Sequence, residues 1–353
     1  MRPRIVPDVV REHAALAAFL WVQLDTLVAA DPPNAEALPP TRARLEANLD
    51  ALRIAGEEAW PFLIDQWEAF TDKGELFAFG FHALDRQDVA RLDEAVEFAR
   101  AFPETERGLV GAFRWLPPTP NAPIVRDWIA SVDPVRRSVA VAVLAEFQVD
   151  PGERLRRLME DEHPRVRAHA CRLAGVIERR EVSDLIRERL ADPDESVRFW
   201  AGLSGARLGV GADALAALKP AAARGDLVAL RTVVETEPSE DVRQWLGRLA
   251  EADATRPVAV RGVGMMGDRQ VLSWLLRRMT VPSLAAAAGA SFLQLFPEAR
   301  AVEGLFSADP AVLGPAFEAD ETVWGELPVA RHIQQWALEL NLISNESATT
   351  ETR

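Results

Sequence analysis

The chain has 353 residues, a length that suits two ordinary domains or one elongated repeat array. Hydrophobic residues make up 48% and charged residues 27%, which excludes a chain too polar to build a core. Asp and Glu number 54 against 40 Lys and Arg, so the formal net charge is −14. Such a chain repels phosphate backbones, so we expect no nucleic-acid partner and favour a basic or mixed-charge protein partner.

Two short features bear on the compartment. The single cysteine, Cys171, can form no internal disulfide, which indicates a reducing compartment, and its apolar neighbours favour a buried structural side chain over a catalytic thiol. The apolar stretch 14–22 follows Glu12 and His13 and is too short to cross a bilayer. We therefore expect a cytoplasmic protein with no membrane segment.

The first third of the chain reads as helical. Residues 1–9 hold two prolines and are expected to be extended, and helical spacing of apolar residues then predicts helices over 10–30 and 41–56. Thr41 is the expected cap of the second helix and Gly56 its stop. Further helical segments follow near 57–71, 74–86, 88–102 and 105–116, and no strand pattern occurs. This predicts an N-terminal helical region over 1–116.

Four prolines fall within residues 117–123, where a continuing helix is not expected. The stretch is predicted to be a Pro-rich connection, either a domain boundary or a longer turn between stacked helices.

A short pattern then recurs every 31 residues. It aligns four valines and, after the first three, an arginine, and fixed intervals in this range are typical of repeat arrays. The aligned residues are Val135, Val166, Val197 and Val228, with Arg136, Arg167 and Arg198. A leucine-faced helix and a Pro- or Asp-bearing turn precede each Val-Arg helix.

These residues resemble HEAT repeats, in which Asp-Pro precedes Val-Arg and alanines follow at helical spacing. The resemblance covers about 121–280 and is strong in 133–147, 161–176 and 192–209. It implies an all-α fold, a right-handed α-solenoid of HEAT-like helix pairs over 124–296, with the Val-Arg helices on the concave side. It also implies a structural ladder in which Arg136, Arg167 and Arg198 pair with acidic residues of the neighbouring turn, and Asp161 and Asp192 can supply it.

A narrower resemblance lies elsewhere in the chain. Residues 44–60, 73–92 and 287–292 resemble an uncharacterised family of proteobacterial HEAT-like proteins often found beside type VI secretion genes. This implies a bacterial adaptor or immunity protein, whose partner is a secreted toxin or a secretion component. Beyond 296 the repeat loosens, so we expect a C-terminal helical cap over 297–343, with a last helix at 330–340, and a disordered tail over 344–353.

The sequence offers little catalytic chemistry. Residues 262–267 form a literal G-x-G-x-x-G, but no strand precedes it, so helix packing and a helix stop account for its glycines better than a nucleotide does. The five histidines show no metal-ligand spacing, and the acidic groups at 160–163 and at Glu318, Asp320 and Glu321 read as solvated turns. We predict no catalytic residue, cofactor or metal.

Residues just beyond the repeat valines are the candidate binding surface. Phe199 and Trp200 are predicted to project from the concave face and anchor a protein partner, because exposed aromatics beside arginines are typical of binding hot spots. His169 and Arg231 share the row of Trp200, and Arg172 and Arg207 flank it. The alternative, that Trp200 packs against the next helix, stays open.

Two other functional classes stay open beside a non-enzymatic binding protein. One is an enzyme on a HEAT-like scaffold, as in bilin lyases or DNA glycosylases, which would need a deep cleft collecting His82, His169 or paired carboxylates. The other is a passive assembly scaffold that binds several partners weakly.

Overall fold

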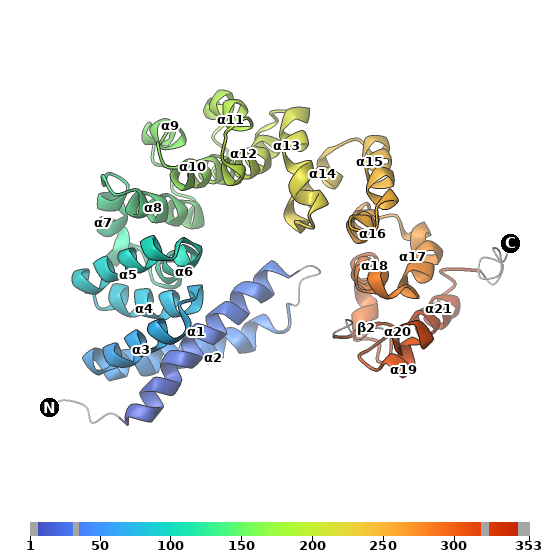
Figure 1. Ribbon diagram of the computed structural model, residues 1–353, viewed down its shortest axis with the longest axis horizontal. Helices are drawn as coiled ribbons and strands as arrows, with labels where there is room; N and C mark the ends of the chain where they lie inside the picture. The colour runs from blue at the N-terminus through green and yellow to red at the C-terminus, as the bar shows by residue number, and fades with distance from the viewer. Residues whose placement is uncertain (1–5, 31–34, 319–324, 345–353) are drawn as a thin grey trace. The chain divides into compact units, whose positions relative to one another are not determined.

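The computed structural model describes residues 6–30, 35–318 and 325–344, and these fold almost wholly into α-helices (Figure 1). In the described residues the only strands are β1 (Phe306–Ser307) and β2 (Leu327–Pro328), which pair antiparallel with Phe306 opposite Pro328. The predicted all-α solenoid of HEAT-like helix pairs is confirmed. The chain forms two compact units, residues 1–210 and 211–353.

The first unit runs from α1 to α12. Its helices, with the short 3-10 turns that precede three of them, are α1 (Pro7–Ala29), α2 (Leu38–Ala55), η1 (Gly56–Ala59), α3 (Trp60–Phe70), α4 (Lys73–Asp85), α5 (Val89–Ala101), η2 (Pro103–Thr105), α6 (Glu106–Trp115), α7 (Pro118–Trp128), α8 (Pro134–Phe147), α9 (Arg154–Met159), α10 (Pro164–Val176), η3 (Arg180–Val182), α11 (Ser183–Arg189) and α12 (Glu195–Leu208).

From α5 onward the first unit alternates between two rows of helices. An inner row contains α6, α8, α10 and α12, and an outer row contains α5, α7, α9 and α11 (Figure 1). Successive helices of the inner row pack on one another. Within this unit the rows follow a curve, with the Val-Arg helices α8, α10 and α12 on its inner side (Figure 1).

Helix α4 is the centre of the N-terminal part. Every residue from Leu76 to Leu84 is buried, and Phe77, Phe79 and Phe81 are fully enclosed. A helix that is apolar on all sides must be surrounded by other helices, and α1, α3, α5 and α6 pack around this one. The Trp21 and Phe77 rings stack with centroids 4.8 Å apart. This aromatic core fixes α6, which carries much of the site described below.

Small residues bring the inner helices together. A Cβ added to Gly175 on α10 would lie 2.7 Å from Ser204 Cβ on α12, and the Ser204 hydroxyl donates to the Cys171 carbonyl at 2.7 Å. Interiors packed this closely leave no room for a larger side chain at the glycine. The glycine lets α12 approach α10, and the Ser204 hydroxyl of α12 then bonds to the backbone of α10.

The stretch 117–123 is predicted to be a Pro-rich connection, but in the structure most of it is helical. Pro118 begins α7, and Pro120 and Pro123 lie inside this helix. The first backbone N–H groups of a helix have no intrahelical acceptor, so Pro118 and Pro120 remove no hydrogen bond, and only Pro123 does. The division into compact units falls instead between Val210 and Gly211.

Two smaller expectations near the N-terminus also differ from the structure. The first helix begins at Pro7, so residues 7–9 are not extended, and residues 1–5 lie outside the described part. Thr41 lies inside α2, where its hydroxyl donates to the Ala37 carbonyl at 2.8 Å, because the helix already starts at Leu38. Gly56 ends this helix with a φ of 60°, as expected of a glycine stop.

The second unit continues with helix pairs and ends in a mixed segment. Its elements are α13 (Ala212–Ala223), α14 (Leu227–Thr236), α15 (Ser239–Glu251), α16 (Arg256–Met265), η4 (Arg269–Val271), α17 (Leu272–Met279), α18 (Pro282–Leu295), η5 (Pro297–Ala301), β1, α19 (Pro310–Leu313), α20 (Pro315–Glu318), β2 and α21 (Ala330–Glu339). Helix α21 covers most of the predicted 330–340 and packs on α17. The predicted disordered tail lies outside the described residues from 345 onward.

The second unit repeats the close helix approach of the first. Gly264 on α16 meets Ser291 on α18, where an added Cβ would lie 2.5 Å from the serine Cβ, and the Ser291 hydroxyl donates to the Val260 carbonyl at 3.0 Å. In both units the accepting carbonyl lies four residues before the glycine. None of the helices in the described residues combines the length and apolarity that a bilayer-spanning helix requires.

His82 on α4 is enclosed in the N-terminal core. Its Nε2 lies 3.0 Å from the Gly56 carbonyl, and its ring meets the Trp60 ring edge-on at 4.6 Å. Burial, aided by the nearby Arg86 charge, lowers the pKa of His82 to about 4 although the Gly56 hydrogen bond opposes the shift. The imidazole is therefore neutral in the folded protein at neutral pH.

Replacing Gly175 by Ala is expected to destabilise the first unit by about 2 kcal/mol, because the new methyl group overlaps Ser204 on the adjacent helix. Urea unfolding followed by circular dichroism measures the change. Gly247→Ala on α15 is the matched control, since its Cβ meets no atom within 4 Å and alanine is the better helix former. Equal stability of the two variants would contradict the close helix approach.

Stability should also fall in mild acid because of His82. In the unfolded chain this histidine has a pKa near 6.5 and is protonated below that pH. In the folded protein it becomes protonated only near pH 4. The free energy of unfolding is therefore constant above about pH 6.5 and decreases by about 3 kcal/mol as the pH falls through this window. His82→Gln, which keeps an N–H donor but does not titrate, should remove this slope in urea titrations; an unchanged slope would assign it to other groups.

Candidate functional site

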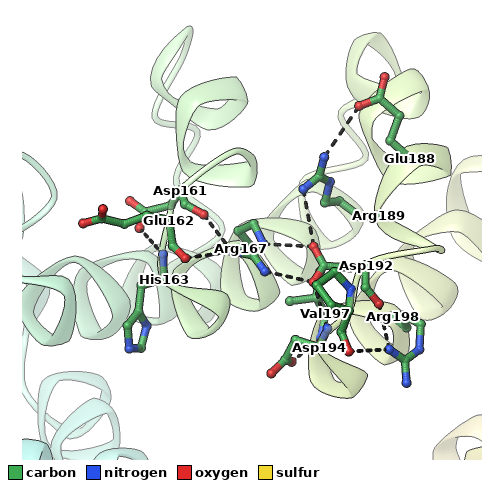
Figure 2. A network of polar contacts seen from close by, with 11 residues as sticks. Asp161, Glu162, His163, Arg167, Glu188, Arg189, Asp192, Asp194, Val197 and Arg198 are labelled. Carbon is green, nitrogen blue, oxygen red and sulfur yellow. Dashed lines mark hydrogen bonds and ion pairs between the residues drawn. The ribbon is translucent and has the colours of Figure 1, made fainter.

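Arginine–aspartate pairs link successive turns of the first unit, and Figure 2 shows the pair of Arg167 and Asp192. Arg167 on α10 donates from Nε and Nη2 to both carboxylate oxygens of Asp192, each at 2.9 Å, and Arg137 on α8 binds Asp161 in the same way at 2.8 and 2.9 Å. The Nη1 of Arg167 also donates to the Asp161 and Glu162 carbonyls. Each arginine thus fastens its own turn to the following one.

The Asp192 carboxylate is ionised although it is buried. Its side chain is only 1% exposed. Burial alone would raise the pKa of Asp192, but the hydrogen bonds from Arg167 and from the Asp194 amide outweigh it and hold the pKa below its usual value. An ion pair of this kind is satisfied only while both partners are present.

The predicted ladder differs at its two ends. Arg136 pairs with Asp93 at 2.8 Å, and the next residue, Arg137, takes the ladder position. Arg198 donates to the Asp192 and Pro193 carbonyls, at 2.7 and 2.9 Å, and so fastens its own turn only (Figure 2). The arginines at this position are therefore Arg137, Arg167 and Arg198, separated by 30 and then 31 residues. A strict period of 31 residues selects Arg136 in place of Arg137.

The same slip changes the valine positions. Val166 and Val197 are fully buried, whereas Val135 is half-buried and Val228 is 59% exposed. In α14 the buried position is occupied by Ala229. The Ala229 amide donates to the side chain of the N-cap residue Asp226, just as the Val197 amide donates to the side chain of Asp194. A one-residue difference in turn length moves every later side chain around its helix by 100°.

A groove runs along the inner row of the first unit. It consists of two hollows of about 350 and 370 Å³ that share Arg107, Val110 and Glu146. The first hollow is lined by residues of α6, α8, α10 and α12 with the turn before α6, and the second by residues of α1, α2, α6 and α8. We call the two together the groove. Trp200 lines the first hollow and Trp115 the second.

Trp200 is partly buried and lies between two other side chains. The Phe199 ring meets it edge-on at 5.4 Å, and the Arg172 guanidinium lies 5.3 Å from its centroid. Trp200 packs on the core cluster and still lines the groove. The two interpretations offered by the sequence, core packing and exposure to the groove, each describe part of this side chain.

His169 belongs to a polar cluster centred on Glu106, in the first turn of α6. The Ser138 hydroxyl donates to Glu106 Oε1 at 2.7 Å, His169 Nε2 lies 3.2 Å from the same oxygen, and Arg165 lies 3.4 Å from Oε2. Burial favours a raised pKa for Glu106, but His169, Ser138 and Arg165 outweigh it and lower the pKa. The cluster therefore holds an ionised carboxylate at the floor of the groove.

The other predicted site residues lie apart from the groove lining. Arg207 is exposed near the end of α12, and Arg231 lies in the second unit, where it pairs with Glu235 at 3.5 Å. The predicted set therefore reduces in the groove to His169, Arg172 and Trp200, with Phe199 packed against the last.

Glu106, Glu146 and the arginines of α6 are not marked by the repeat pattern. Glu106 and the arginines of α6 lie before the repeats, Glu146 lies in α8 away from the aligned positions, and only the fold brings α6 beside α8 and within reach of His169 on α10. Arg165 could have been found, because it directly precedes the aligned Val166.

The described residues show little that could perform chemistry. They contain no group of three His, Cys, Asp or Glu residues placed to hold a metal ion. Burial raises the pKa of the Cys171 thiol to about 12, so it stays protonated. Ser138 donates to Glu106 and not to His169, so these three do not form a nucleophile–base pair.

The G-x-G-x-x-G stretch has a structural explanation. Gly262 faces Leu246 and Gly264 faces Ser291, at positions where a Cβ would overlap the neighbouring helix. Gly267 has a φ of 76° just after α16, the conformation that glycine adopts at helix ends.

Arg167→Ala is expected to lower the free energy of unfolding by about 3 kcal/mol, because it leaves the Asp192 carboxylate buried without its main partner. Arg156→Ala is the control, since Arg156 and Asp184 form an exposed pair that contributes little to stability. Urea unfolding of both variants measures the difference. A loss below about 1 kcal/mol for Arg167→Ala would show that the ladder does not hold the turns together.

Comparison with known proteins adds one finding to this geometry. The family described as HEAT repeats matches residues 152–236, which run from α9 to α14. No curated protein and no solved structure matches the chain significantly. The matched stretch includes the Arg167–Asp192 pair and the close approach of α10 and α12. The paired helices and recurring arginine–aspartate links agree with this match, which shows that residues 152–236 are similar to HEAT repeats.

Proposed function

We propose that this protein binds another protein in the groove, with Trp200 as the anchor and Phe199 beside it. HEAT repeats commonly mediate interactions between proteins, and this chain contains them. The observation that carries the proposal is the partly exposed Trp200 ring in the groove wall, where Phe199 and Arg172 hold it on two sides.

A tryptophan held in this way is suited to binding. Its large apolar surface contributes contact area, and because neighbouring side chains already fix its orientation, little conformational entropy is lost when a partner covers it. Aromatic and arginine side chains gathered in a concave site are the usual composition of an interface hot spot. Arg172 is itself held by Glu146 at 2.6 Å, so the pair is preorganised.

We further propose that the role is non-enzymatic. His169 and the carboxylates of Glu106 and Glu146 do meet in the groove, as an enzyme on this scaffold would require. Their carboxylates, however, are occupied by neighbouring side chains: Glu106 accepts from Ser138, His169 and Arg165, and Glu146 binds Arg114 and Arg172, while His169 Nδ1 is buried without a hydrogen-bond partner among the described residues. Such a cluster stabilises the groove floor and leaves no carboxyl group with a raised pKa to act as an acid.

A finer proposal concerns the partner. On the resemblance of residues 44–60, 73–92 and 287–292 alone, we propose a cytoplasmic adaptor or immunity protein for a type VI secretion effector. Copurification of the full chain with the products of adjacent genes tests this directly. A stable complex with a toxin or secretion component supports it, and recovery of unrelated proteins only would remove it.

Trp200→Ala should weaken the complex with a copurified partner by roughly 30-fold, about 2 kcal/mol, because an interface anchor is lost. Isothermal titration calorimetry measures the affinity. Phe70→Ala is the matched control, since Phe70 on α3 is 66% exposed, is aromatic and does not line the groove. Unchanged affinity of the Trp200 variant, with its helical circular dichroism intact, would exclude this tryptophan as the anchor.

A further inference from the structure

The acidic residues of the groove are mostly hidden. Three carboxylates line it with side chains exposed by only 13% (Asp25), 9% (Glu146) and 7% (Glu106). Each already binds cationic side chains: Arg107 and Lys73 hold Asp25, and Arg165 lies beside Glu106. Glu104, at the edge of the first hollow, is the exposed exception among the lining carboxylates.

The arginines of the groove are exposed instead. The side chains of Arg107, Arg114 and Arg165 are 55%, 63% and 38% exposed. A guanidinium carries five N–H donors, and Arg114 donates one of its own to Glu146 at 2.6 Å. The groove therefore has nearly balanced formal charge but presents mainly cationic groups to whatever enters it, in a chain whose net charge is −14.

Glu146 keeps Arg114 and Arg172 in place. One carboxylate oxygen accepts from Arg114 and the other from Arg172, both at 2.6 Å. Burial alone would raise the pKa of Glu146, but Arg172, Arg114 and Arg107 together lower it. A buried carboxylate with a lowered pKa is ionised at neutral pH and fixes the guanidinium groups around it, so they need not be ordered when a ligand binds.

Apolar surface lies at both ends of this cationic stretch. Trp115 in the second hollow has the Arg42 guanidinium 4.7 Å from its ring centroid, as Trp200 has Arg172 at 5.3 Å. Because the two hollows share Arg107, Val110 and Glu146, a single extended segment can pass from one tryptophan to the other.

We propose that the groove takes an extended acidic segment of the partner protein, whose carboxylates pair with Arg107, Arg114 and Arg165 and whose apolar side chains contact Trp115 and Trp200. This deepens the proposed function and rests on it. Carboxylates suit exposed guanidinium groups, which bind them through two parallel hydrogen bonds.

A single-stranded nucleic acid would also use arginines and tryptophans, but the observations favour a peptide. Arg42 and Arg172 each cover one of the tryptophan rings on which bases would stack. A polyanion as long as an oligonucleotide also meets the acidic remainder of the chain, which a short acidic segment avoids.

Selection of random peptides displayed on phage against the full chain tests the proposal. The selected peptides should be enriched in Asp and Glu together with apolar residues, and their affinity, measured by fluorescence anisotropy, should fall as salt is raised. The double variant Arg114→Gln/Arg165→Gln should bind them at least roughly tenfold more weakly. In this variant Glu146 still has Arg172 as a hydrogen-bond partner, and Glu106 still has Ser138 and His169. The buried carboxylates of the groove floor therefore remain paired.

Arg207→Gln is the matched control, because Arg207 is an exposed arginine of α12 outside the groove. This variant should bind the peptides with the affinity of the wild type. The proposal would be overturned if the selected peptides showed no excess of acidic residues, or if the double variant bound them with unchanged affinity. It would also be overturned if an oligo-dT probe bound as tightly as the selected peptides. Should a copurified partner still depend on Trp200 in that case, binding in the groove stands and only its acidic character is lost.

Discussion

The short distance between certain neighbouring helices is the constraint on which much of this structure depends. At α10 and α12, and again at α16 and α18, a glycine on one helix faces a serine on the next, and the serine hydroxyl bonds to a carbonyl of the glycine-bearing helix. The missing side chain allows the approach, and the hydrogen bond satisfies a polar group that the approach would otherwise bury. At α10 and α12, side chains at the flanks of the two helices are consequently brought together in the wall of the groove.

The turns are held by a second kind of contact. Arg137 and Arg167 each bind a carboxylate of the next turn and carbonyls of their own, so charge and backbone are satisfied together. Such pairs contribute little net energy compared with apolar packing, but they tolerate only one geometry, because an unpaired buried carboxylate is costly. Their role is therefore to fix the position of each repeat relative to the next.

The same logic explains the groove. Glu106 and Glu146 are buried in the groove, and each remains ionised because several donors surround it. The arginines reach solvent while all the lining carboxylates but Glu104 are hidden, so a strongly acidic chain can present a local surface of opposite sign. With Trp200 and Trp115 fixed beside the same arginines, the surface combines apolar area and charge in a form that is already ordered before a partner arrives.

The sequence by itself determined the helical class, the repeat and the Arg167–Asp192 pair, because these depend on local periodicity and on neighbours about one repeat apart. It could not determine the register at the ends of the array, where a turn shorter or longer by one residue put Arg137 in place of Arg136 and Ala229 in place of Val228. Nor could it show that the prolines of 117–123 lie in α7. The groove was decided by tertiary structure alone: α6 carries no repeat pattern, and Glu106 meets Ser138 and His169 only because their helices, 32 and 63 residues further on, pack beside it.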